Sequence, residues 1–316
     1  MNHISIGKEQ SPINLPPRDY SIESPIHPVF QYDEILPEEK IEKDDLFAEE
    51  KKAKPLQLKL INSQLKIKYN SFGKLVTLDG AVYSAKEIVI HTPAEHTIDG
   101  KKFDMELQIV HYGKTKGDIA KQVVLSFLFE KQPGATNQFL DSLDFYNLPS
   151  PINKVRPLRD GLYIPKIFFS ESDKETPMMK PFSFYTYQGS ISYPPCTQRT
   201  INYVASQPIK IGTTALQLFE EALRVPDMMD SKGNIIQSPV LPQNNRKVQP
   251  LNGRSVFFYD HVKYCGPDRI KKPAKKKGHY EKIVKKQVDY FFVNGMNPSG
   301  LPGAFVVTPK EALGKK

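Results

Sequence analysis

Cysteine, long apolar runs and glycosylation acceptors are scarce or absent in this sequence. The 316 residues include only two cysteines, Cys196 and Cys265, which are too few for a disulfide framework. No apolar run approaches the length of a membrane-spanning helix, and Asn-x-Ser/Thr occurs only with proline between, at Asn297. Residues 1–10 have neither the apolar core of a signal peptide nor the arginine-rich pattern of a transit peptide. We therefore expect an intracellular protein that does not span a membrane and keeps both thiols reduced.

The charge and the apolar content indicate the broad class of the protein. Lys and Arg number 44 against 35 Asp and Glu, a formal net charge of +9. Such a charge is typical of a protein with an acidic partner, or simply of a soluble basic protein. Hydrophobic residues make up 39% of the chain, with 18 Phe and 15 Tyr, which is enough for a sizeable core. A β fold of this length can form one large domain.

The most informative stretch is residues 86–113. Residues 87–91 and 106–111 have the alternating, β-branched pattern of strands, and Asp99-Gly100 between them is a turn signal. Three histidines and five acidic residues fall within this stretch. That density of polar side chains on two strands indicates a polar site on a sheet.

The two strands resemble the centre of an α-class carbonic anhydrase. The matching blocks are His91-Thr92-Pro93-Ala94-Glu95-His96-Thr97 and Glu106-Leu107-Gln108-Ile109-Val110-His111. In that family three histidines on these strands bind zinc, because side chains two residues apart share one face of a strand and converge on one metal. The resemblance implies a mainly β fold, with a large twisted, mostly antiparallel central sheet and short peripheral helices. It places the three ligand positions at Val89, His91 and Gln108.

Only one of these three positions is a histidine. An isopropyl group donates no electron pair and a carboxamide oxygen is a poor zinc ligand, whereas catalytic zinc requires three protein ligands and a bound water. We therefore expect no zinc cofactor, no catalytic residue and no CO2 hydration. The resemblance defines a vestigial site of eight residues: Val89, His91, Gln108, Glu95, Glu106, Ser192, Tyr193 and Gln64. It implies structural roles for His96 and His111.

Three further blocks match family signatures in the correct order. They are Gln10-Ser11-Pro12-Ile13-Asn14, the segment 185–196, and the pattern Asn-x-Arg-x-x-Gln-x-Leu-x-x-Arg within residues 244–254. The resemblance gives Ser192 and Glu95 the places of the hydroxyl–glutamate pair that orients zinc-bound hydroxide. Tyr193 should narrow the pocket mouth, and Gln64 replaces the proton-shuttle histidine. Tryptophan is absent from the chain. The positions where the family has tryptophans around its site are here Thr92, Tyr185, Asn202 and Asn245.

The segments at the two ends of the chain differ in composition from the family-like region between them. We divide the chain into an N-terminal arm over residues 1–55, a carbonic-anhydrase-like domain over 56–259 and a basic C-terminal extension over 260–316. Residues 33–50 hold nine acids and two lysines, which is typical of a solvated arm or of a segment that wraps a partner. The extension carries eight clustered lysines that we expect to contact an acidic partner: Lys271, Lys272, Lys275, Lys276, Lys277, Lys282, Lys285 and Lys286.

The sequence therefore favours an acatalytic structural or interaction subunit of a large intracellular assembly, docked through its terminal extensions. We expect protein partners with an acidic surface, microtubules among them, and neither a small-molecule substrate nor nucleic acid. Two alternatives stay open: a degenerate pocket for a small anion or metabolite, and residual carbonate dehydratase activity. The expected location is the cytoplasm, including ciliary or cytoskeletal structures, with mitochondria as the alternative.

Overall fold

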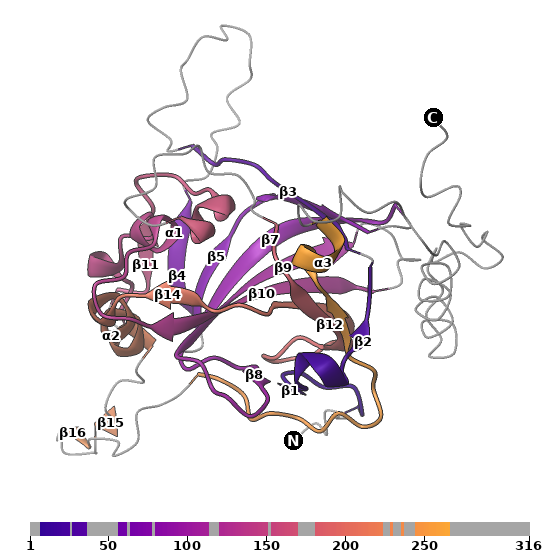
Figure 1. Cartoon of the computed structure of the whole chain (residues 1–316). Coiled ribbons are helices and arrows are strands. Elements are labelled where there is room, and N and C mark those ends of the chain that lie inside the picture. The colour runs from indigo at the N-terminus through magenta and orange to yellow at the C-terminus, as the bar shows by residue number, and fades with distance from the viewer. Residues whose placement is uncertain are drawn as a thin grey trace, which may run out of the picture.

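The computed structural model describes most of the family-like region and only residues 260–265 of the C-terminal extension (Figure 1). The described residues are 7–25, 27–36, 56–61, 64–77, 80–113, 120–150, 153–169, 181–223, 228–229, 235–236 and 244–265. The eight lysines of the extension lie outside these ranges.

A large twisted sheet forms the body of the described chain (Figure 1). Its centre consists of the long strands β7 (Val82–His91), β9 (Met105–Gly113) and β10 (Gln122–Lys131). Beyond β7 lie β5 (Gln64–Lys68), β4 (Gln57–Ile61) and β11 (Val155–Pro157). Beyond β10 lie β13 (Gln198–Ala205), β12 (Phe184–Ser190), β17 (Phe257–Tyr259) and β2 (Ile22–Glu23).

Three more strands join this sheet beside the main order. β3 (Val29–Tyr32) pairs with β6 (Gly73–Val76), which pairs with β7, and β14 (Ile209–Ile211) pairs with β10. Within the sheet the β10–β13, β10–β14 and β17–β2 pairs are parallel and the other described pairs are antiparallel. The prediction of a large, mostly antiparallel twisted sheet is confirmed.

Two small strand pairs stand apart from the large sheet. β1 (Asn14–Leu15) runs parallel to β8 (Thr97–Ile98), and β15 (Met228–Met229) runs antiparallel to β16 (Ile235–Ile236). The β1–β8 pair fixes the N-terminal signature block beside the turn that connects β7 to β9.

Short helices cover one face of the sheet, as expected. They include α1 (Gln138–Asp141), the 3-10 helices η3 (Phe145–Asn147) and η4 (Ile164–Phe168), and α2 (Thr213–Leu223). In α2 the apolar residues recur on one side, so Leu216 and Phe219 are buried in the same hydrophobic cluster as the strand residues Ile88, Ile90 and Leu107. The other two described helices are η1 (Arg18–Tyr20), which precedes β2 in the chain, and α3 (His261–Cys265), which follows β17.

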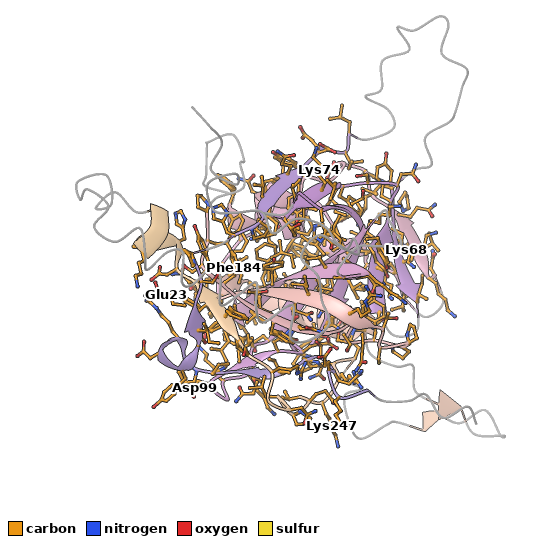
Figure 2. The ribbon with its side chains drawn as sticks, turned by 90° about the vertical axis from the view of Figure 1, so that its right-hand side faces the viewer. Glu23, Lys68, Lys74, Asp99, Phe184 and Lys247 are labelled. Carbon is orange, nitrogen blue, oxygen red and sulfur yellow. The ribbon has the colours of Figure 1, made fainter. Side chains whose placement is uncertain are left out.

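Strand residues alternate between this core and the opposite face of the sheet. Ile88 and Ile90 belong to the helix-covered core, whereas Val89 lies in a separate buried cluster with Val110, Val124, Ile191 and Tyr193. The vestigial ligand positions therefore lie on the face that the helices do not cover. Charged side chains such as Lys68, Lys74 and Lys247 lie at the rim of the molecule, and Phe184 lies in its interior (Figure 2).

The N-terminal part of the chain is integrated into the fold, which differs from the predicted arm. β2 pairs with β17 and β3 pairs with β6, and the Arg18 guanidinium forms an ion pair with Asp260. Backbone pairing satisfies the hydrogen-bonding groups of these segments. Strands β2 and β3 within residues 7–36 thus pair with strands of the large sheet, and the division of the chain at residue 55 stays a prediction.

Among the described residues, none of the helices has the length and apolar character that crossing a bilayer requires.

Candidate functional site

The structure brings together seven of the eight predicted site residues around the β7–β9 pair. The register places Val89 opposite Gln108 and His91 opposite Glu106, so these four side chains share one face of adjacent strands. Glu95 follows in the connection to β8, and Ser192 and Tyr193 follow β12. All seven are buried. Gln64 is buried at the start of β5 and has no described hydrogen bond to the other seven.

The Gln108 carboxamide lies at the centre of a buried hydrogen-bond network. Its Nε2 donates to Glu106 Oε1 at 2.9 Å and to Glu95 Oε2 at 3.2 Å. Its Oε1 accepts from the Ser192 hydroxyl at 3.3 Å. Both ends of the amide are therefore engaged by protein groups at a position where the family resemblance implies a metal ligand.

The predicted pair of Ser192 and Glu95 does not form. The Ser192 hydroxyl donates to Gln108, and Glu95 instead accepts from the Arg246 backbone N–H at 3.1 Å through Oε1 and from Gln108 through Oε2. The physical reason is the amide of Gln108, which lies between the two groups and bonds to both. The contact that would orient a hydroxide is thus replaced by an internal bridge.

His91, the retained histidine, is completely buried. Its Nδ1 lies 3.4 Å from Glu95 Oε1 and 3.5 Å from the Asn244 carbonyl oxygen. Its Nε2 has no hydrogen-bond partner within the described part of the chain. The imidazole stacks near the Tyr193 ring, with 6.5 Å between the ring centroids.

Glu106 and His96 form the structural centre beneath the site. Glu106 Oε2 accepts from the backbone N–H groups of Glu95 at 3.0 Å and His96 at 2.9 Å, and Oε1 lies 2.8 Å from His96 Nδ1. Burial alone would raise the pKa of the Glu106 carboxyl. The charge of His96 and the hydrogen bonds from His96 and Gln108 outweigh burial and lower the pKa to about 2. His96 Nε2 lies 2.6 Å from the Tyr187 hydroxyl. His96 thus has the geometry of the structural histidine that we predicted.

His111 likewise lies in the interior, as predicted. Its Nδ1 donates to the Val123 carbonyl at 3.1 Å and its Nε2 lies 3.0 Å from the Tyr32 hydroxyl. Burial lowers its pKa to about 4, so the ring is neutral at pH 7.

Sequence reasoning missed a buried ion pair next to the vestigial positions. Lys66 pairs with Val89 in the β5–β7 register, and its Nζ lies 3.2 Å from Glu87 Oε1. The same Nζ lies 3.8 Å from the centroid of the Tyr193 ring. The available signal was the alternation of β5, which places Lys66 on the same face as the site.

Cys196 follows the Pro194-Pro195 pair and forms no disulfide with a described residue. Burial raises the pKa of its thiol. The side chain of Cys265 lies outside the described residues, so the prediction of two unpaired thiols is not tested at that position.

The residues present do not fit the zinc ion that the family implies. Val89 has no donor atom, and the Gln108 amide donates to two carboxylates and accepts from a hydroxyl. Among the three ligand positions, His91 alone has an imidazole, and its Nε2 has no hydrogen-bond partner in the described part of the chain. One imidazole is fewer than the three protein ligands that catalytic zinc requires.

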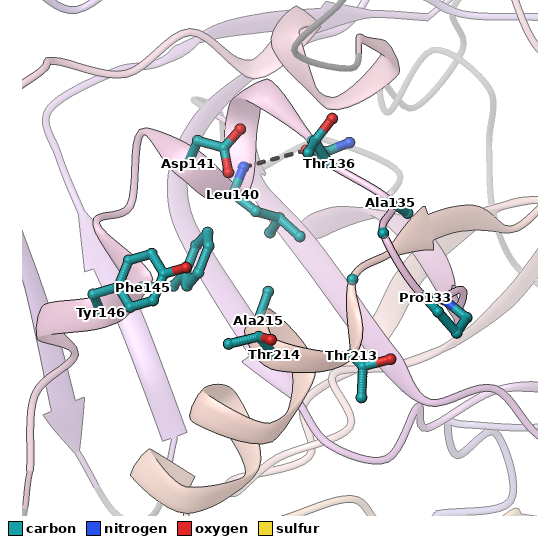
Figure 3. Close-up of a pocket in the computed structure, with 13 residues that line it drawn as sticks. Pro133, Ala135, Thr136, Leu140, Asp141, Phe145, Tyr146, Thr213, Thr214 and Ala215 are labelled. Atoms are coloured by element: carbon teal, nitrogen blue, oxygen red, sulfur yellow. Dashed lines mark hydrogen bonds between the residues drawn. The ribbon is translucent and has the colours of Figure 1, made fainter.

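A separate cavity of about 300 Å³ lies on the helix-covered side of the sheet (Figure 3). It is lined by Leu140 and Asp141 of α1, by Phe145 and Tyr146, and by the first turn of α2. Among the described residues that line it, Asp141 is the only charged one. The cavity contains none of the predicted site residues.

Comparison with known proteins identifies the class to which this fold and site belong. A model of eukaryotic-type carbonic anhydrase matches residues 2–260. The chain therefore belongs to the eukaryotic-type carbonic anhydrase family.

Individual relatives agree with this assignment. Alpha carbonic anhydrase 3 of Arabidopsis thaliana is 26% identical over 269 residues, which are 84% of this chain and 80% of that protein. Alpha carbonic anhydrase 8 of the same plant is 30% identical over 206 residues. This match covers 64% of the present chain but only 46% of that relative. A structure of α-carbonic anhydrase from Thermovibrio ammonificans in complex with sulfanilamide is 23% identical. It has a TM-score of 0.57 and covers 80% of this chain and 88% of that one. That likeness shows the fold.

Proposed function

We propose that this chain is a carbonic-anhydrase-family protein that does not hydrate CO2 and acts as a structural or interaction subunit of a large intracellular assembly. The observation that carries the proposal is the state of the ligand positions. Val89 has no donor, and Gln108 is bound at both ends to Glu95, Glu106 and Ser192. A carbonic anhydrase needs a zinc-bound water of lowered pKa, and zinc needs three ligands to hold it there.

The burial of the site supports an acatalytic role over a pocket for a small anion or metabolite. Such a pocket requires His91, Gln108, Ser192 and Tyr193 to line an accessible cleft. Each of these four residues is at most 8% exposed. A dissolved ligand therefore has little side-chain surface to contact at these positions.

The binding elements of the proposed subunit are its charged segments beyond the described body. The eight lysines between residues 271 and 286 repel one another in isolation, and an acidic protein surface would neutralise them. The cytoplasm, including cilia and the cytoskeleton, is the proposed location, and a mitochondrial complex is the alternative.

Zinc content and hydration activity test the first half of the proposal. The full-length protein should contain far less than one zinc per chain by elemental analysis after purification in zinc-supplemented buffer. It should also show no CO2 hydration above the uncatalysed rate. An active α-carbonic anhydrase purified in parallel is the control. Near-unit zinc together with hydration that a sulfonamide inhibits would overturn the acatalytic assignment.

A truncation tests the interaction role. The cut should follow Cys265, because Asp260 and Lys263 of this region form ion pairs with Arg18 and Glu23. Deleting residues 266–316 should leave circular dichroism and the melting temperature unchanged but release the protein from its assembly in sedimentation of a native extract. A full-length variant with the eight lysines changed to Gln separates charge from the rest of the segment. Co-sedimentation of the truncated chain at the wild-type level would contradict the proposed role.

A further inference from the structure

Lys66, Glu87 and Tyr193 form a compact group directly above Val89. Lys66 is the cross-strand neighbour of Val89, and Glu87 lies two residues before Val89 on the same strand. Lys66 Nζ lies 3.2 Å from one carboxylate oxygen of Glu87, and Tyr112 donates to the other at 3.1 Å. The β5 and β7 strands are thus joined by an ion pair on the face that carries the vestigial site.

The Tyr193 ring covers this ion pair. Lys66 Nζ lies 3.8 Å from the ring centroid, within the range of a cation–π contact. The same ring stacks near His91 and belongs to the buried cluster of Val89 and Val110. It therefore extends from the retained histidine to the lysine, across the valine that stands at a ligand position.

The exposed fractions of Lys66 and Lys68 differ strongly, which is consistent with a cover over the Lys66–Glu87 ion pair alone. Lys66 and Lys68 lie on one face of β5, and both ammonium groups lie close to Glu87. The Lys66 side chain is 9% exposed, whereas the Lys68 side chain is 58% exposed. Lys66 is thus enclosed although its strand neighbour, with the same acidic partner, reaches solvent.

We propose that Lys66, Glu87 and Tyr193 form an internal plug that fills the space above the vestigial ligand positions and closes the site to dissolved molecules. The inference rests on the proposed function and deepens it. The chain has lost its chemistry through Val89 and Gln108, and it has separately lost access to the site through the plug. Restoring histidines at the two positions would leave the site closed. A buried ion pair needs close partners to offset its desolvation, and the Tyr193 ring and the Tyr112 hydroxyl supply them.

Acetylation of the intact full-length protein tests the plug. Limiting acetic anhydride is applied at pH 8, and the acetylation rates of Lys66 and Lys68 are measured by mass spectrometry of proteolytic fragments. Burial lowers the pKa of Lys66, although Glu87 acts in the opposite direction, and a lower pKa by itself would make the amine react faster. Slow acetylation of Lys66 therefore reports steric enclosure. We expect Lys66 to react at least tenfold more slowly than Lys68, and a smaller difference would overturn the proposal.

Two substitutions at Tyr193 identify the group that closes the site. Tyr193→Phe keeps the ring and should keep Lys66 protected at least tenfold. Tyr193→Ser removes the ring and should bring the acetylation rate of Lys66 close to that of Lys68. Circular dichroism checks that each variant is folded. Persistent protection in folded Tyr193→Ser would show that the ring is not the cover and would refute the plug. If Tyr193→Ser unfolds, the ratio of the Lys68 and Lys66 acetylation rates in the wild type and in Tyr193→Phe decides whether the proposal stands. Zinc content does not enter this measurement, so failure of the plug is distinguishable from failure of the proposed function.

Discussion

Replacing Glu106 by Gln should destabilise the protein strongly, because four donors converge on this buried carboxylate. They are the backbone N–H groups of Glu95 and His96, His96 Nδ1 and Gln108 Nε2, at 2.8–3.0 Å. A carboxamide offers one acceptor oxygen and directs its NH2 group at the remaining donors, which leaves buried polar groups unpaired.

The pKa of Glu106 gives the magnitude. Its folded-state value is about 2 against an ordinary value of 4.5, and each pKa unit corresponds to about 1.4 kcal/mol. The ionised network therefore contributes on the order of 3 kcal/mol to the free energy of unfolding. Because the folded-state pKa is depressed, this contribution is fully present above the ordinary pKa and is lost as the pH falls toward 2. We expect Glu106→Gln to cost on the order of 3 kcal/mol at pH 7 and roughly half of that or less at pH 3.

Equilibrium urea unfolding of the wild type and the variant, at pH 7 and pH 3, measures both quantities. Glu130→Gln is the matched control. Interaction with Lys101 and Lys210 lowers the pKa of the Glu130 carboxyl to about 2 as well, but its ion pairs lie at the surface, so its loss should leave the unfolding midpoint unchanged. A cost below about 1 kcal/mol for Glu106→Gln at pH 7, or a cost that does not shrink at pH 3, would refute this reasoning.

Three further substitutions test other parts of the fold by urea unfolding, each against a baseline that the structure provides. The wild type should lose up to about 3 kcal/mol of stability between pH 6.5 and 4, because burial lowers the folded-state pKa of His111 to about 4 and the unfolded chain takes up the proton first. His111→Gln should remove this loss. Equal pH profiles would contradict this. Arg254→Met should cost about 3 kcal/mol, since its guanidinium donates to three backbone carbonyls, whereas exposed Lys247→Met should change stability by less than about 0.5 kcal/mol. Phe219→Ala should lower the free energy of unfolding by about 4 kcal/mol, because it leaves a cavity in the main core. A cost under about 1 kcal/mol would contradict this and show that neighbouring side chains fill the space left by the ring.

The sequence was sufficient to predict which strand residues share one face of the sheet, because the two-residue period of a strand is strict. Side chains two residues apart share a face, so placing Val89 and His91 on one strand and Glu106 and Gln108 on the next already determined which side chains would meet. The cross-strand register agrees. Helix α2 was equally predictable, since its apolar positions recur at helical spacing.

The contacts of individual side chains were not predictable in the same way. Placing Ser192 beside Glu95 assumed that the family pair persists, but the amide of Gln108 has both a donor and an acceptor end and bridges the two. The Lys66–Glu87 pair joins different strands, and no local pattern specifies which of Lys66 and Lys68 is enclosed. The pairing of the N-terminal segment was unpredictable for a related reason: β2 completes a sheet edge with β17 near the other end of the described chain, and local composition does not reveal such a pairing.

The hydrogen bonds around Gln108 oppose a histidine at this position. A neutral imidazole has one N–H group, whereas the Gln108 NH2 group donates to two carboxylates at once. Changing Gln108 to His would therefore leave one buried carboxylate short of a donor, while Val89 still provides no second nitrogen for a metal. The Gln108→His change alone would weaken folding without assembling a metal site. The buried hydrogen bonds of Gln108 thus constrain this position more than exposed positions are constrained, so substitutions accumulate more readily on the surface of the protein than at the centre of its sheet.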